Sequence, residues 1–204
     1  MIDIFLKAKH WQLFIAMLGI PLLFQLYTMF GMFQEFEIKT NPNPENVMGV
    51  LRIFPIIMTL FIGVFFAWFW SIAIGLQKNI PEEIIMKVNK FKVFFFIPLV
   101  YMFILMIYMG SLFSGMGNNG FSNSGWIVAI ILPLHLLSMY CMFYLIYFVS
   151  KTIKTVELQR KVGFGDFAVE FFLLWFYFIG IWIVQPKVNK LSGKENNIAN
   201  NSPR

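Results

Sequence analysis

Residues 50–76 read VLRIFPIIMTLFIGVFFAWFWSIAIGL, and this stretch decides the fold. Arg52, near its start, is the only charged side chain in it. An α-helix needs about 20 apolar residues to cross a hydrocarbon core of roughly 30 Å, so this stretch is long enough to span a membrane. Four further runs share its apolar character: 13–33, 93–113, 126–149 and 167–184. The sequence therefore predicts an all-α integral membrane protein, a bundle of four or five transmembrane helices.

The composition favours the same class. Of the 204 residues, 59% are hydrophobic and only 13% are charged, whereas a soluble domain carries about 25% charged residues. The loops between the apolar runs are too short to enclose a core of their own. We therefore expect a single membrane domain over residues 1–186, followed by a polar, disordered tail over 187–204. Tryptophans near the ends of the runs are expected at membrane interfaces: Trp11, Trp68, Trp70, Trp126 and Trp182.

The distribution of lysine and arginine predicts the orientation. The N-terminus and the second and fourth loops together carry ten of these residues, whereas the first and third loops carry one. Basic residues stay on the cytoplasmic side. The sequence thus predicts a cytoplasmic N-terminus in a bacterial-type cytoplasmic (inner) membrane. Because the basic residues flank membrane segments instead of covering a soluble face, the net charge of +6 indicates contact with the lipid bilayer and no nucleic-acid binding.

The fifth run leaves two alternatives open. If 167–184 spans the membrane, the basic tail is exported against the charge rule. If it re-enters or lies in the interface, the tail stays inside. Gly180, Gln185 and Pro186 offer places to bend, but 18 apolar residues interrupted only by Glu170 also make a good span.

Three segments outside the runs have helical patterns of their own. Residues 1–12 are expected to form an amphipathic elbow helix, with Ile2, Phe5 and Leu6 on lipid. Residues 79–91 are expected to form an amphipathic cytoplasmic helix, capped by Asn79 with Pro81 in its first turn. The fourth loop is expected to extend the fourth helix, with Gly163 in a left-handed cap and Asp166 starting the next helix.

Ionisable residues at membrane depth are the first candidates for chemistry. Arg52 is expected either to reach the headgroups or to contact an ion. Glu170 either sits favourably in the first turn of a helix or acts as a proton-carrying or partner-pairing carboxylate. His135, near the bilayer middle, either bonds a neighbouring helix or belongs to a relay. With only two histidines, and His10 at the interface, bis-histidine haem ligation is not expected, and we predict no cofactor or metal.

No hydrolase, zinc-protease or phosphate-loop motif is present, and this pattern favours a protein without enzymatic activity. Our leading hypothesis is a multi-pass membrane subunit that acts through contacts with a protein partner or in a homo-oligomer. The alternative is a small permease, channel or ABC-type transporter subunit, with 1–12 as elbow and 79–91 as coupling-like helix. Residues expected to dock a partner lie in the two basic loops: Ile84, Lys87, Val88, Lys90, Phe91, Lys154, Arg160 and Lys161.

Overall fold

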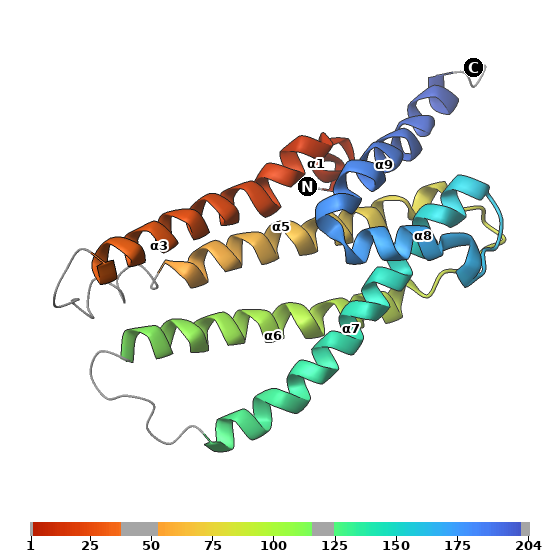
Figure 1. Ribbon diagram of the computed structural model, residues 1–204. Coiled ribbons are helices and arrows are strands. Elements are labelled where there is room, and N and C mark those ends of the chain that lie inside the picture. Colours follow the sequence, from red (N-terminus) through yellow and green to blue (C-terminus); the bar gives the residue numbers. More distant parts are fainter. Residues whose placement is uncertain (1, 38–52, 116–124, 201–204) are drawn as a thin grey trace.

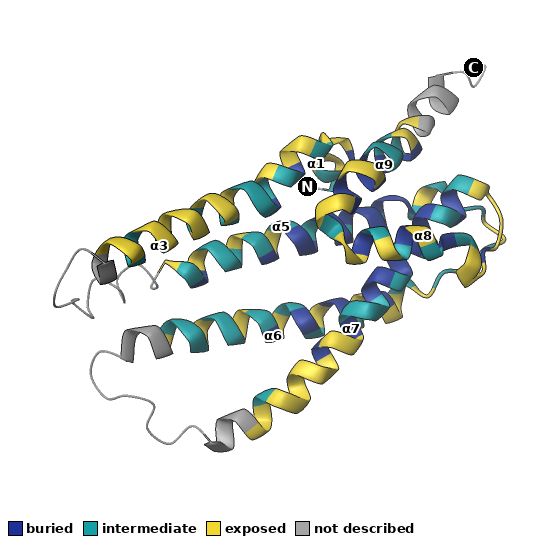
Figure 2. Cartoon of the chain, viewed as in Figure 1, coloured by how far each residue is buried: buried dark blue, intermediate teal, exposed yellow. Residues whose placement is uncertain are grey.

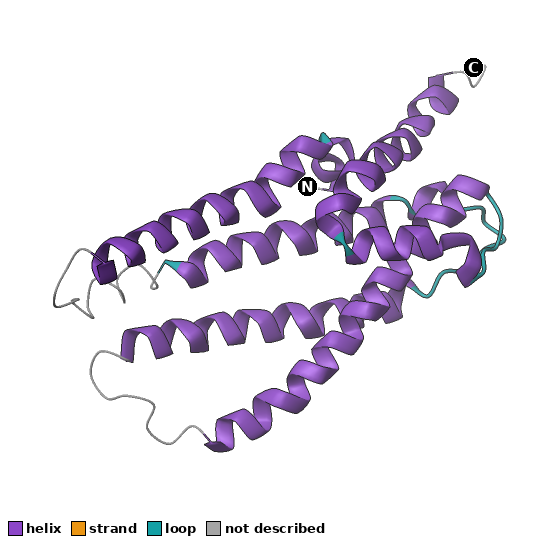
Figure 3. Cartoon of the chain, in the orientation of Figure 1, coloured by secondary structure: helices purple, strands orange, loops and turns teal. Residues whose placement is uncertain are grey.

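The computed structural model describes residues 2–37, 53–115 and 125–200, with side chains over 2–34, 53–111 and 129–193. Within these ranges all regular structure is helical (Figure 3). Four helical stretches are long and apolar enough to cross a membrane: His10–Gln34, Phe54–Asn79, Val88–Ser111 and Ala129–Leu158. The prediction of an all-helical chain with at least four such helices is confirmed.

A short helix α1 (Ile2–Lys7) precedes the first long helix, which is assembled from α2 (His10–Phe14), a π-helical turn η1 (Ile15–Gly19) and α3 (Ile20–Glu37). In the π turn the Ile20 N–H donates to the Ile15 carbonyl. Pro21 follows directly. A proline has no N–H and its ring crowds the carbonyl four residues earlier, so the widened turn accommodates it without ending the helix.

Helix α5 (Phe54–Gly75) is the central element of the bundle. Its half nearer Gly75 is packed on all sides, because Trp68, Phe69 and Ile72 have no exposed surface. Pro55 lies in the first turn, where a missing N–H costs nothing. A short 3₁₀ turn, η2 (Gln77–Asn79), follows the helix.

Helices α6 (Val88–Gly115) and α7 (Gly125–Leu158) complete the set of long helices. The two lie together near residues 88 and 158 and diverge toward the opposite end (Figure 1). Buried residues concentrate where the helices meet (Figure 2). We call the end of the bundle that holds residues 76–88 and 159–163 the packed end, and the opposite end the splayed end.

The fifth apolar run does not form one helix. It is divided between α8 (Phe164–Trp175) and α9 (Tyr177–Asn200), which break at Phe176 and form a hairpin. Phe176 leaves helical geometry with ψ 58°, and its carbonyl accepts from Ile179 and Gly180 at the start of α9. The hairpin is tight at Gly180, where an added Cβ would overlap the Leu173 carbonyl. The run bends at Phe176 instead of at Gly180 or Pro186.

The helix expected over 79–91 is not formed. After η2 the chain is irregular from Ile80 to Lys87, and α6 begins at Val88. Asn79 does not cap a helix, because its side chain donates to the Leu191 carbonyl at 3.0 Å and its own carbonyl accepts from Gln159 at 3.0 Å. These contacts hold the segment against α9 and the end of α7, and they outweigh the local helical pattern.

The prediction for the N-terminal elbow helix was also wrong, because it placed the apolar side chains on lipid. α1 is a helix, but Leu6 is buried and packs with Ile2 against α5. Gly75 leaves room for this contact, since a Cβ there would lie 2.6 Å from Leu6 Cδ1 and 2.7 Å from Ile2 Cγ2. The apolar side of residues 2–7 therefore faces protein. A break at Ala8 and Lys9 then turns the chain into α2.

The expected extension of the fourth helix is confirmed to Leu158, with Ile153 and Val156 buried. The cap residues differ. Gln159, and not Gly163, has positive φ (51°). Gly163 is instead the extended N-cap of α8, and its N–H donates to Asp166 Oδ2 at 2.8 Å.

The boundary expected at residue 187 falls inside α9. Val188 and Leu191 beyond it are buried in the main core. Residues 187–191 therefore belong to the packed bundle and not to a tail.

Candidate functional site

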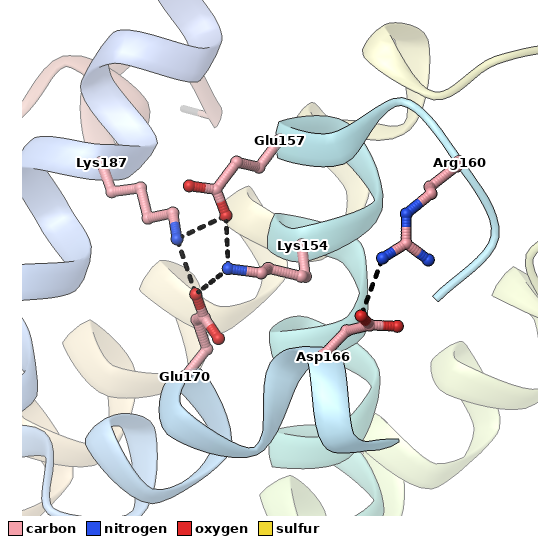
Figure 4. A network of polar contacts seen from close by, with 6 residues as sticks. All are labelled: Lys154, Glu157, Arg160, Asp166, Glu170 and Lys187. Carbon is pink, nitrogen blue, oxygen red and sulfur yellow. Dashed lines mark hydrogen bonds and ion pairs between the residues drawn. The ribbon is translucent and has the colours of Figure 1, made fainter. Parts of the chain in front are cut away.

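Four charged side chains from three helices meet at the packed end (Figure 4). Lys154 and Glu157 come from α7, Glu170 from α8 and Lys187 from α9. Lys187 Nζ lies 2.6 Å from Glu170 Oε1 and 2.7 Å from Glu157 Oε2. Lys154 Nζ lies 3.3 Å and 2.9 Å from the same two oxygens. Each carboxylate faces two ammonium groups, so this ion cluster is neutral as a whole.

The ion cluster explains why a carboxylate is tolerated in an apolar segment. Glu170 is 4% exposed, and a buried carboxylate is costly unless it is paired. It is the seventh residue of α8, too far along to interact with the positive end of the helix dipole, which acts within the first turn. Burial raises the pKa of Glu170, but the hydrogen bond from Lys187 and the adjacent positive charges lower it more, so the pKa lies below its ordinary value.

A second pair closes the turn between α7 and α8. Arg160 donates to Asp166 Oδ1 at 2.9 Å. The hydrogen bond from the Gly163 N–H, together with that from Arg160, lowers the pKa of Asp166. The Arg160 side chain is 57% exposed and that of Asp166 is 29% exposed, and the pair therefore orients the turn more than it stabilises the bundle.

Gln185 joins the two ends of the chain. Its side chain has no exposed surface. The carbonyl oxygen accepts from the Trp68 indole at 2.7 Å, and the amide donates to the Phe5 and Ala8 carbonyls at 2.8 and 2.9 Å. Carbonyls at the end of α1 lack helical partners, and Gln185 supplies them. Trp68, expected at a membrane interface, is instead a fully buried member of this network.

His135 lies on the face of α7 that points toward α6, and its Nδ1 is 3.1 Å from the Tyr101 hydroxyl. The contact with a neighbouring helix is one of the two alternatives for this residue. His135 is itself exposed at the surface of the isolated chain and lines a cavity of about 230 Å³ between α6, α7 and Trp175 at the end of α8. Among the described residues, no three His, Cys, Asp or Glu side chains are placed to hold a metal.

The remaining predicted residues differ in how far they are buried. Arg52 lies outside the described residues. Phe91 is fully buried in the core, and Lys154 belongs to the ion cluster. Ile84 and Val88 are half-buried. The predicted docking residues with exposed side chains are Lys87, Lys90, Arg160 and Lys161.

Comparison with known proteins assigns the chain to no family. No protein-family model, no curated protein and no solved structure matches the chain.

Sequence reasoning missed Glu157, Lys187, Gln185 and Tyr101. Glu157 carries a weak signal, its i,i+3 spacing from Lys154. Lys187 follows Glu170 by 17 residues, which in one straight helix is about 25 Å. Only a hairpin brings them together, and the sequence does not indicate where that hairpin turns.

Proposed function

We propose that this chain is a non-enzymatic, multi-pass membrane subunit that acts by contact with a protein partner through the packed end. The surface concerned, which we call the basic face, consists of five exposed residues at this end: Ile85, Lys87, Lys90, Arg160 and Lys161. The observation that carries the proposal is Ile85, whose side chain is 92% exposed. A large apolar side chain held out among cations suits a complementary surface of acidic and apolar groups.

The basic face is held in place by the fold. The hydrogen bond from Gln159 to the Asn79 carbonyl links its two loops, and the Ile84 N–H donates to the Pro81 carbonyl at 3.0 Å just before Ile85. Exposed Glu82 and Glu83 border it. Pre-ordered loops lose little conformational entropy on binding, which supports a docking role for them.

The cation distribution supports a topology for this proposal. With four spans and a hairpin of α8 and α9, both termini lie on the cytoplasmic side of a bacterial-type inner membrane. Lys187 and Lys190 then join the other basic residues there, and the conflict with the charge rule disappears.

The transporter-subunit alternative has lost its two proposed helices, because residues 80–87 are not helical and residues 2–7 pack against the bundle. Two polar side chains in its spans are also bonded within their own helices. Thr28 bonds the Gln25 carbonyl and Thr59 the Pro55 carbonyl, both at 2.8 Å. We therefore favour the contact subunit.

The test is gentle extraction of the tagged full chain from its native membrane, followed by native mass spectrometry. We expect a stoichiometric heteromer that the variant I85S/K87Q/K161Q loses. A matched control is I4S/K7Q/K9Q, because Ile4, Lys7 and Lys9 are also exposed but lie on the N-terminal pieces. A homo-oligomer without a partner, or equal loss in both variants, would contradict the proposal.

A further inference from the structure

The cavity between α6, α7 and the end of α8 has the composition of a binding site for a lipophilic molecule. Its volume is about 230 Å³. Apolar side chains form most of the wall, among them Met102, Met142, Phe143 and Trp175. No charged side chain lines it. The polar residues that do are His135 and Ser138, one helical turn apart on the same face of α7.

Ser138 is the unusual member of the wall. It is 1% exposed, and within the described part of the chain its Oγ has no hydrogen-bond partner. Buried hydroxyls are normally bonded, and leaving one unbonded costs free energy. A serine inside a helix usually bonds the carbonyl four residues earlier, as Ser150 does with Ile146 at 2.6 Å. Ser138 does not, so its hydroxyl is available to a ligand in the cavity.

His135 adds a second polar group at the mouth of the cavity. Its Nδ1 is occupied by the Tyr101 hydroxyl, which is nearly buried. When Tyr101 donates this bond, the ring proton lies on Nε2, which is then a hydrogen-bond donor. Met139 and Trp175 are each 45% exposed, so the cavity opens on the outer surface of the helices, where a membrane would supply its ligands.

We propose that this cavity binds an uncharged, membrane-soluble molecule through a carbonyl oxygen that accepts a hydrogen bond from Ser138 Oγ. The volume is below that of ordinary drug-sized pockets, roughly 300–1,000 Å³, and suits one ring or a short segment with the remainder in lipid. Two sources have this chemistry: the ring carbonyl of a free lipophile such as a quinone, and the ester carbonyl of a membrane lipid. The inference is independent of the partner proposed for the basic face.

The test uses the full chain in nanodiscs of ether-linked phosphatidylcholine, which has no ester carbonyl, with decyl-p-benzoquinone as the probe. Equilibrium dialysis gives its affinity. One hydrogen bond to a buried group corresponds to about a tenfold change, and we expect Ser138→Ala to weaken binding by that factor. Because Ser138→Ala removes an unbonded hydroxyl, the Tm without probe stays equal or rises, which separates lost binding from misfolding.

The matched control is Thr59→Val. Thr59 lines another cavity, of about 340 Å³ between α5 and α6, but its hydroxyl already bonds Pro55. Quinone affinity should not change in this variant.

The lipid source is tested in the same proteins by native mass spectrometry. Retention of ester-linked but not ether-linked phosphatidylcholine by the wild type, and its loss in Ser138→Ala, would assign the carbonyl to a lipid ester. A Ser138-dependent affinity for the quinone in ether lipid would assign it to a free lipophile. If wild type and Ser138→Ala retain both probes equally, the proposal is overturned.

Discussion

The indole N–H of Trp68 donates a 2.7 Å hydrogen bond to the Gln185 side-chain carbonyl, 117 residues further along the chain. Both side chains are completely buried. The amide nitrogen of Gln185 continues the network to the carbonyls of Phe5 and Ala8. One glutamine thus connects the N-terminal helix, the central helix and the last helix.

Replacing Gln185 by Leu should therefore destabilise the bundle strongly. It leaves the Trp68 N–H and the Phe5 carbonyl without this partner, whereas the Ala8 carbonyl keeps a hydrogen bond from Asn189 at 3.1 Å. Each unsatisfied buried group costs about 1–3 kcal/mol. We expect a loss of at least about 2 kcal/mol in unfolding free energy, measured by denaturant titration in detergent. Gln77→Leu is the control, because the Gln77 side chain bonds the carbonyl of Ala73, one turn earlier in the chain, and its loss should be small.

Gly180→Ala tests the tight hairpin of α8 and α9. The new methyl would overlap the Leu173 carbonyl, a backbone group that cannot rotate away. Overpacking of this kind costs roughly 1–3 kcal/mol, which should appear as a lower Tm in detergent. Gly63→Ala is the control: its Cβ meets nothing within 4 Å, and alanine favours the helix. Equal behaviour of the two variants would mean that α8 and α9 do not make this close contact.

The ion cluster predicts that substitutions of Lys187 and Glu170 have non-additive effects on stability. Lys187→Met removes the closest partner of Glu170 and leaves a buried carboxylate with one lysine 3.3 Å away. We expect a loss of roughly 3 kcal/mol. Adding Glu170→Gln to Lys187→Met removes the buried charge and should recover part of that loss. If the two losses simply add, Glu170 and Lys187 do not interact.

The lowered pKa of Glu170 sets the direction of an acid effect. Its ion pairs contribute fully above the unfolded pKa of about 4.3, and the contribution disappears as the pH falls through the lower pKa of the folded state. The difference in Tm between wild type and Glu170→Gln should therefore be largest near neutral pH and vanish in acid. A constant difference across this range would show that Glu170 is not ionised in the fold.

The four-span topology is testable with single cysteines on a Cys141→Ala background. Cysteines at Ile85 and Ser192 should react with a membrane-impermeant maleimide from the same side. One at Ser122, in the third loop of the sequence, should react from the opposite side. If the cysteines at positions 192 and 122 react from the same side, residues 167–184 cross the membrane.

Run length and hydropathy predicted the four long helices well, because their apolarity is continuous. One alternative that stayed open and one wrong prediction share a physical cause. Residues 167–184 have the composition of a span, and 79–91 have the spacing of an amphipathic helix, yet distant residues decide both conformations. Lys187 lies beyond the end of the run and draws α9 back toward Glu170. Leu191 and Gln159 take the polar groups of Asn79 that would have capped a helix.

Trp68 and Ser138 illustrate the corresponding limit for the candidate sites. A tryptophan near the end of an apolar run is typical of a membrane interface, and only the position of Gln185 reveals that Trp68 is buried. A single serine in a span carries no signal, because the same residue can bond its own helix or face a cavity. His135 and Glu170 were identifiable from the sequence as polar residues in apolar runs, but their partners Tyr101 and Lys187 were not.

The contact between Gln185 and the end of α1 also fixes an order of assembly. The side chain that satisfies the carbonyls of Phe5 and Ala8 leaves the ribosome 180 and 177 residues after them. Until then α1 can lie on α5 but its last carbonyls have no protein donor from α9. Helices α1 and α9 consequently reach their final state together, and a nascent chain that stops before residue 185 leaves α1 without the side chain that bonds its last carbonyls.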